Sequence, residues 1–117
     1  MRVLLVDDRE SIRELLEEII ISSLPDVEVI TAGSAVEAWE KFKEEGRLDL
    51  VVTDLHMETK TAGLALAETI KKETPETPVV LMSATPEITL TGFGVVDAFI
   101  EKPFNINEFV ALIKKFL

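Results

Sequence analysis

The chain alternates five times between a short run of apolar residues and a longer stretch whose apolar residues recur at helical spacing. Short runs rich in Val, Ile and Leu are typical of strands that are buried on both faces. Strands that alternate with helices indicate a parallel sheet covered by helices on both sides. The strands are predicted at residues 2–6, 27–31, 48–53, 79–82 and 98–101. The predicted fold class is therefore α/β, with five βα units in three layers.

The stretches between the strands have one apolar helical face each. The first is predicted to bury Ile12, Leu15, Leu16, Ile19 and Ile20, which follow the spacing i, i+3, i+4, i+7, i+8. The last is predicted to bury Ile106, Phe109, Val110, Ile113 and Phe116. Ser34 and Asn105 stand where helix N-caps are expected, and Glu108 forms a capping box with Asn105. A further helix is predicted at about residues 64–73.

One βα unit is poorly supported by helix propensity. Residues 86–96 contain two Gly and two Thr, and each Gly costs about 1 kcal/mol in a helix interior relative to Ala. The fourth helix is therefore predicted to be short or irregular.

Length and charge restrict the class of protein. A chain of 117 residues fits one domain, predicted to span residues 1–117. The net charge is −10 and the sequence has no basic cluster, which argues against direct binding of nucleic acid or of an anionic membrane. No apolar run approaches the roughly 18 residues of a membrane-spanning helix, and two early carboxylates argue against a signal peptide. We therefore expect a cytoplasmic protein.

The residue types present also restrict the chemistry. The sequence has no Cys and one His, which excludes disulfides, thiolate nucleophiles and multi-histidine metal sites. Carboxylates, hydroxyls, amines and backbone groups remain available for a functional site.

Polar residues follow the predicted strands. Asp7 and Asp8 follow the first strand, Asp54 the third, Ser83 the fourth and Lys102 the fifth. In an open α/β sheet, ligands bind outside the carboxyl ends of the strands, so these side chains are expected at one edge. Close carboxylates repel one another, and Mg²⁺ relieves that repulsion while it shares its ligand shell with phosphate.

These residue types suit phosphoryl transfer. A Mg²⁺ or Mn²⁺ ion between Asp8 and Asp54 leaves a place for phosphate oxygens, which Lys102 would neutralise and the Ser83 hydroxyl would contact. A carboxylate can itself be the attacking nucleophile.

With these residues in place, the chain resembles the receiver domain of two-component response regulators and is similar to the single-domain chemotaxis regulator. The motifs are Asp7-Asp8, Asp54, Ser83-Ala84 and Lys102-Pro103. The resemblance covers nearly the whole chain and implies a flavodoxin-like fold with the sheet order 2-1-3-4-5.

The resemblance also implies roles for individual residues. Asp54 would accept a phosphoryl group from a sensor histidine kinase or a histidine phosphotransfer protein. Asp7, Asp8, Asp54 and the backbone carbonyl of His56 would hold Mg²⁺. Lys102 would contact the phosphoryl oxygens, next to a cis peptide bond to Pro103. Ser83 and Phe99 would switch conformation, and the output would pass by protein contact to a downstream partner that the sequence does not identify.

The sequence departs from the family pattern in two places. The family usually has Met-Pro after the acceptor and a Gly eight residues beyond it, whereas here Met57 is followed by Glu58, and Gly63 lies nine residues after Asp54. The segment from Ser83 to Lys102 is about three residues shorter than is usual, which again points to a reduced fourth helix.

Each site residue also has an interpretation without a functional role. Asp8 and Ser83 could cap the segments that follow them, Phe99 could be a core aromatic residue, and His56 could be a surface loop residue. Among functions, a phosphorylation-independent interaction module is the main alternative. A Mg²⁺-dependent phosphatase is disfavoured because His56 stands where a second acid is needed. An FMN binder is disfavoured because its first loop should contain Thr, Ser and Gly. We expect no enzymatic turnover of a separate substrate.

Overall fold

The structure is a computed structural model that describes residues 1–84 and 96–117. The predicted short or irregular fourth helix falls within residues 85–95 and lies outside the described residues.

Five parallel strands form one sheet in the order β2-β1-β3-β4-β5. They are β1 (Arg2–Val6), β2 (Glu28–Ala32), β3 (Leu50–Asp54), β4 (Val79–Ser83) and β5 (Ala98–Glu101). Every residue of β3 and β4 is buried, as their continuous apolar runs predict. The flavodoxin-like fold and its strand order are therefore confirmed.

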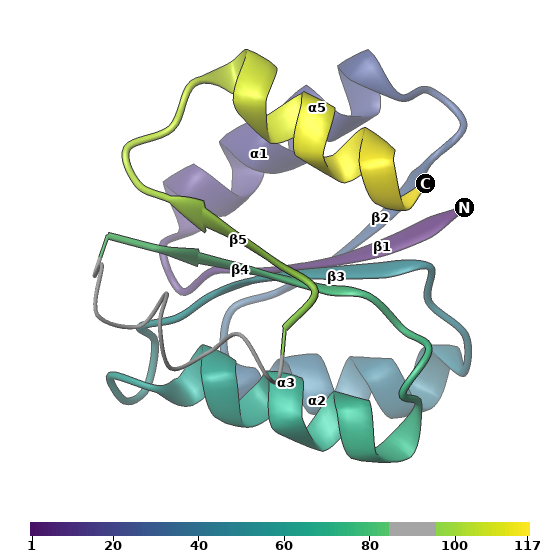
Figure 1. Cartoon of the computed structure of the whole chain (residues 1–117), viewed down its shortest axis with the longest axis vertical. Helices are drawn as coiled ribbons and strands as arrows, with labels where there is room; N and C mark the ends of the chain where they lie inside the picture. Colours follow the sequence, from purple (N-terminus) through teal and green to yellow (C-terminus); the bar gives the residue numbers. More distant parts are fainter. Residues whose placement is uncertain (85–95) are drawn as a thin grey trace.

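Within the described residues, two helices lie on each face of the sheet (Figure 1). The helices α1 (Glu10–Ser23) and α5 (Ile106–Phe116) lie on one face, and α2 (Ala35–Glu45) and α3 (Ala62–Glu73) lie on the other. Successive residues of a strand point to opposite faces. Val3 and Leu5 accordingly pack with α1 and α5, while Leu4 and Val6 pack with α2 and α3.

Local signals set the helix ends. The Ser34 hydroxyl accepts a hydrogen bond from the Glu37 N–H at 3.0 Å, and the Asn105 side chain accepts one from the Glu108 N–H at 2.7 Å. Both predicted N-caps are therefore confirmed. Gly46 ends α2 with a φ of +76°, a conformation that favours glycine.

Two predicted core positions are wrong. Leu15 is 50% exposed and Ile106 is 56% exposed, and both line a shallow depression on the α1 and α5 side. The sheet covers a narrower stripe of α1 than the five-residue pattern suggests, with Leu16 and Ile20 fully buried in it. Ile106 is the first residue of α5, and the buried residues of this helix are Phe109 and Ile113.

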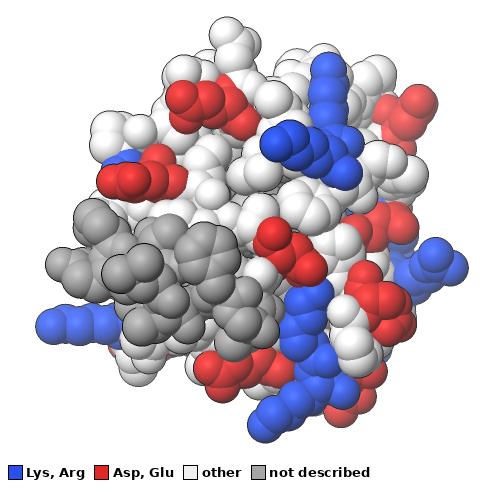
Figure 2. All heavy atoms as spheres, viewed as in Figure 1, with Lys and Arg blue, Asp and Glu red and all other residues white. Residues whose placement is uncertain are grey.

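The molecular surface carries both signs of charge. Figure 2 shows acidic side chains interspersed with basic ones on the face that it draws. Within residues 1–84 and 96–117, no helix is both long enough and apolar enough to cross a membrane.

Candidate functional site

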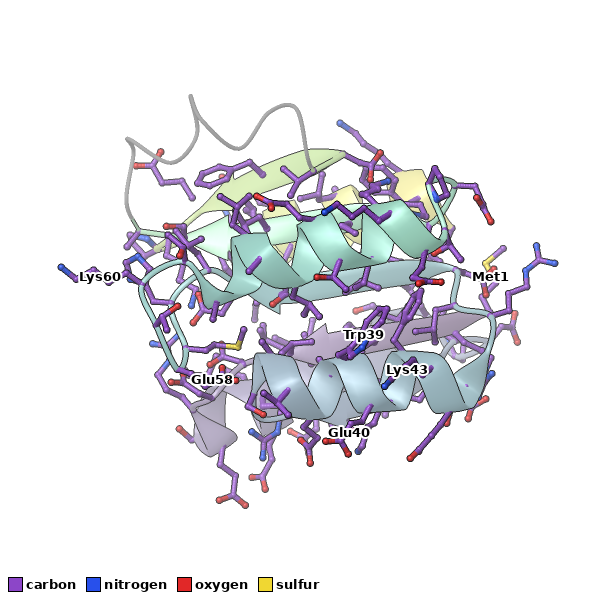
Figure 3. All side chains as sticks on the ribbon, turned by 90° about the horizontal axis from the view of Figure 1, so that it is seen from below. Met1, Trp39, Glu40, Lys43, Glu58 and Lys60 are labelled. Carbon is purple, nitrogen blue, oxygen red and sulfur yellow. The ribbon has the colours of Figure 1, made fainter. Side chains whose placement is uncertain are left out.

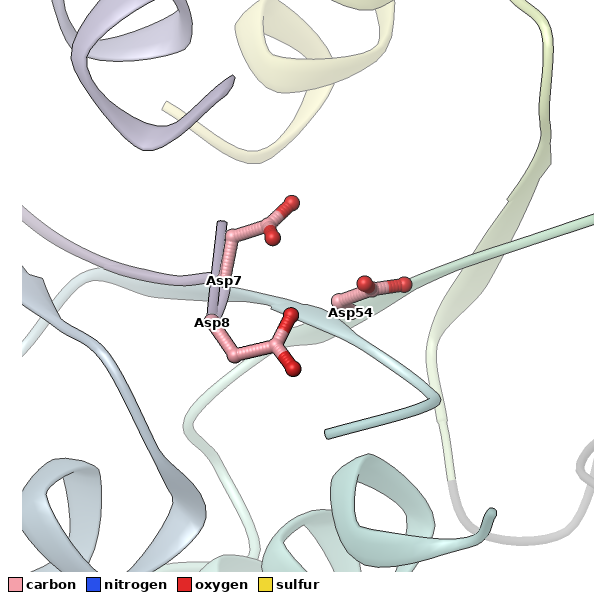
Figure 4. A group of neighbouring side chains, drawn as sticks. All are labelled: Asp7, Asp8 and Asp54. Carbon is pink, nitrogen blue, oxygen red and sulfur yellow. The ribbon is translucent and has the colours of Figure 1, made fainter. Parts of the chain in front are cut away.

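Three carboxylates meet at the carboxyl edge of the sheet (Figure 4). Asp7 and Asp8 directly follow β1, and Asp54 is the last residue of β3, the strand that pairs with β1. One oxygen from each lies within 4.8 Å of the others. Asp7 is fully buried, Asp54 is 6% exposed, and Asp8 faces solvent. The sheet register therefore creates the acidic cluster that the sequence predicts.

Lys102 brings a cation to this cluster from β5, two strands away from β3. Its Nζ lies 3.1 Å from Asp54 Oδ1 and 3.8 Å from Asp7 Oδ2. The Lys102 N–H donates to the Ser83 carbonyl at 2.8 Å, which extends the pairing of β4 with β5 up to the site. The Lys102–Pro103 peptide bond is cis, as the resemblance implies. The predicted approach of Lys102 to Asp54 is confirmed.

Arg9 is a second cation at the site, and the sequence reasoning did not single it out. Its backbone N–H donates to Asp7 Oδ1 at 2.9 Å, and its Nε and Nη2 each lie 3.4 Å from an oxygen of the same carboxylate. Nη2 also lies 3.8 Å from Asp54 Oδ2. The hydrogen bond to Asp7 raises the pKa of Arg9. The position of Arg9 directly after the Asp7-Asp8 pair is the sequence feature that could have indicated this contact.

The environment of Asp54 disfavours its charged form. Burial raises the pKa of the Asp54 carboxyl, and the opposing attraction of Lys102 does not offset it. The carboxylate is held in place because Oδ1 also accepts the Leu55 N–H at 3.0 Å. The described site places three carboxylates beside two cations, so an additional cation would be stabilised there.

A cavity of about 300 Å³ opens onto these groups. It is lined by Asp8, Arg9, Asp54, His56, Ser83, Ala84 and Lys102. Ser83 is buried and His56 is exposed. Phe99 is half-buried on β5, paired with Leu81. The switch roles of Ser83 and Phe99 and the metal-binding role of the His56 carbonyl stay predictions.

The sequence as a whole matches one protein family. The family model described as the response regulator receiver domain matches residues 3–114. The chain belongs to this family. As a receiver domain of a two-component response regulator, it has acidic and basic side chains at the strand ends where the resemblance places the family's motifs.

Known relatives agree with this assignment. The chain is 34% identical over 119 residues to a probable transcriptional regulator, ycf27, from Porphyridium aerugineum, with 99% of this chain and 48% of the relative covered. It thus spans about half the length of that relative. The structure of the response regulator TrrA from Thermotoga maritima in complex with Mg²⁺-BeF is 33% identical, covers 99% of this chain and 98% of that chain, and has a TM-score of 0.86. The receiver domain of NtrX from Brucella abortus is 31% identical over 98% of this chain and 97% of that chain, with a TM-score of 0.85.

The loop that follows Asp54 is attached to α2 by Glu58, which stands where the family usually has proline. The Glu58 carboxylate accepts the N–H groups of Ala35 and Val36, the first two residues of α2, at 3.0 and 3.2 Å. Figure 3 shows Glu58 at this end of α2, with Trp39, Glu40 and Lys43 further along the helix. Partial burial acts to raise the pKa of Glu58, but the backbone N–H groups prevail and lower it. Sequence reasoning missed this long-range cap.

Replacing Glu58 by Ala should lower the free energy of unfolding by about 1 kcal/mol, the usual cost of losing a helix cap. Glu58→Gln, which keeps one acceptor oxygen, should lose less. Because folding lowers the pKa of Glu58, its charge-dependent contribution should be present above the unfolded-state pKa and disappear as pH falls through the folded-state pKa. Urea unfolding followed by circular dichroism measures this. Glu40→Ala, at an exposed glutamate on α2, is the matched control, and equal losses in both variants would contradict the prediction.

Proposed function

We propose that the chain is a receiver in which Asp54 accepts a phosphoryl group from the phosphohistidine of a sensor histidine kinase or a histidine phosphotransfer protein. The observation that supports this most directly is the convergence of Asp54, the Asp7-Asp8 pair and Lys102 at one cavity. Phosphorylation on aspartate is general behaviour of the receiver family, to which the chain belongs.

The residues at the site fit a divalent cation. Three carboxylates beside two cations leave an excess of negative charge, and oxygen ligands are those that Mg²⁺ and Mn²⁺ prefer. Asp7, Asp8, Asp54 and the backbone carbonyl of His56 would hold the ion. The related TrrA structure, which is a complex with Mg²⁺-BeF, supports this assignment. When bound, the ion supplies positive charge that neutralises phosphoryl oxygens during transfer.

The residues around the site each have a role in the transfer. An oxygen of Asp54 forms a bond to phosphorus as the P–N bond of the donor breaks, and the electron pair of that bond stays on the imidazole nitrogen. The Leu55 N–H and Lys102 hold Asp54 Oδ1 and so orient the carboxylate for attack. Lys102 then neutralises a phosphoryl oxygen, and the Ser83 hydroxyl donates to another.

The phosphorylated form signals by a change in conformation. New contacts of Ser83 and Lys102 with the phosphoryl group stabilise one of two states, and Phe99 changes rotamer with them. The output passes through contact with another protein. Because the acceptor belongs to the chain itself, the transfer is stoichiometric, and we expect no turnover of a separate substrate.

Incubating the protein with Mg²⁺ and acetyl phosphate tests the proposal. Intact mass should increase by one phosphoryl group per chain, and EDTA should prevent the increase. Reduction of the acyl phosphate with borohydride, followed by peptide mapping, should place the modification at Asp54. No modification under conditions that label another receiver would contradict the proposal. If partner affinity were also unchanged by beryllium fluoride, the phosphorylation-independent interaction module would be favoured.

A further inference from the structure

Arg9 occupies the acidic cluster in a way that the receiver motifs do not assign. We propose that the Arg9 guanidinium is an internal counter-ion that competes with the divalent cation and so lowers the metal affinity of the resting receiver. This inference rests on the proposed function, because the cation it concerns is the one used in phosphoryl transfer.

The contacts place Arg9 between the two strand ends that supply the metal ligands. Its Nε and Nη2 face the two oxygens of Asp7 as a fork, and Nη2 is also 3.8 Å from Asp54 Oδ2. A guanidinium suits this two-pronged arrangement because its donors are planar and fixed. Asp7 is fully buried, and a buried carboxylate requires compensation by opposite charge. Arg9 provides most of that compensation in the structure, at 3.4 Å from each Asp7 oxygen, and Lys102 lies further away, at 3.8 Å from Oδ2.

A metal ion needs the same carboxylate oxygens. Mg²⁺ requires oxygen ligands at about 2.0–2.1 Å in near-octahedral geometry, whereas the guanidinium holds these oxygens through hydrogen bonds at longer distances. Two cations side by side would also repel each other in a partly buried cavity. Metal binding should therefore require the guanidinium to move away from Asp7 and Asp54.

Arg9 is placed so that it can leave, in contrast to Lys102. The Arg9 side chain is 51% exposed, while that of Lys102 is 18% exposed. The guanidinium can return to water at small cost because it is already half exposed. Lys102 and the incoming metal ion would then compensate the buried Asp7 carboxylate. The backbone N–H of Arg9 can keep its bond to Asp7 Oδ1 during that movement, which preserves the orientation of the carboxylate.

Magnesium titration of the full chain by calorimetry tests this inference. Arg9→Gln should bind Mg²⁺ about fivefold more tightly than the unmodified protein, the fold-change expected when one exposed ion pair no longer opposes binding. Arg47→Gln is the matched control, because it removes the same charge from an exposed arginine before the opposite end of β3. It should change the affinity less than twofold. Arg9→Lys, which keeps the charge but loses the fork, should fall between the two.

The outcomes separate this inference from the proposed function. Unchanged or weaker Mg²⁺ binding by Arg9→Gln, or an equal increase in Arg47→Gln, would overturn the counter-ion role, while labelling of Asp54 would still support the proposed function. Absence of Mg²⁺ binding in all the variants would overturn both. Circular dichroism of each variant checks the fold. If Arg9→Gln does not fold, the Mg²⁺ affinity of Arg9→Lys still tests the inference.

Discussion

Replacing Asp54 by Asn should abolish phosphoryl labelling and at the same time make the folded protein more stable at neutral pH. The loss of labelling follows because an amide has no nucleophilic carboxylate oxygen to form the acyl phosphate. The amide oxygen can still accept the Leu55 N–H and face Lys102, so the local structure should persist. Intact mass after incubation with acetyl phosphate and Mg²⁺ measures the first effect.

The gain in stability follows from the pKa of Asp54. Burial raises that pKa above its unfolded-state value, so ionisation of Asp54 favours the unfolded chain. The unmodified protein should lose stability as pH rises from the unfolded-state pKa, near 3.9, through the folded-state pKa. Asparagine does not titrate, so its advantage over Asp54 should be present at neutral pH and shrink as pH falls below this window. Urea unfolding at several pH values measures the difference.

Asp97→Asn is the matched control for both effects. The Asp97 carboxylate pairs with Lys71 Nζ at 2.5 Å and accepts the Val79 N–H at 2.7 Å, away from the acidic cluster. Loss of the Asp97 charge should lower the free energy of unfolding and leave the labelling of Asp54 intact. Both results are the opposite of those expected for Asp54→Asn. Labelling of the Asp54→Asn variant to the same extent as the unmodified protein would show that the acceptor is another residue. A loss of stability at neutral pH would show that the ion pair with Lys102 outweighs burial.

The convergence of the predicted site residues could be derived from the sequence because it depends on chain topology. In a parallel sheet all carboxyl ends lie on one edge, so the residue that follows each apolar run is expected there. The strand order that the resemblance implies then places the ends of the first, third, fourth and fifth strands next to one another. Asp7, Asp8, Asp54, Ser83 and Lys102 meet for this reason, and no knowledge of their side-chain conformations was needed.

The residues that the sequence did not reveal depend on side-chain direction and on contacts between distant segments. Arg9 lies where a helix begins, and whether its side chain turns toward Asp7 or toward water is not set by spacing. Glu58 caps a helix that starts 23 residues earlier in the chain. The exposure of Leu15 depends on how much of α1 the sheet covers. The spacing of apolar residues does not indicate which way a polar side chain turns, which distant helix it caps, or how much of a helix the sheet covers.

The start of α3 also differs from the prediction, and the difference explains why glycine is needed at position 63. The helix begins at Ala62 rather than at residue 64, so Gly63 lies within its first turn against the end of β3. The Gly63 N–H donates to the Leu55 carbonyl at 2.9 Å. A Cβ atom at this position would lie 2.0 Å from the Asp54 carbonyl oxygen and 2.9 Å from both the Asp54 carbonyl carbon and Leu55 Cα.

Gly63→Ala should therefore lower the free energy of unfolding by about 3 kcal/mol, the upper range for an overpacked site whose neighbours cannot move freely. All three atoms that the Cβ would meet belong to the backbone, and two of them belong to Asp54, the proposed phosphoacceptor. Relief of the clash requires α3 or the end of β3 to shift. Because the Gly63 N–H is bonded to the Leu55 carbonyl, we expect the shift to disturb Asp54 as well, so labelling by acetyl phosphate should also become slower. Urea unfolding and the rate of labelling measure the two effects.

Helix propensity alone predicts the opposite sign, because Ala in a helix is favoured over Gly by about 1 kcal/mol. Gly33→Ala is the matched control, since its Cβ would meet chiefly the end of the flexible Arg13 side chain, at 3.1 Å. We expect that substitution to cost less than about 1 kcal/mol, because the partly buried Arg13 side chain is flexible and needs to shift by only a few tenths of an ångström while it keeps its bond to the Asp7 carbonyl. If Gly63→Ala were as stable as the unmodified protein, α3 would have to lie further from β3 than the structure shows, and the loop after Asp54 would no longer be held by this contact.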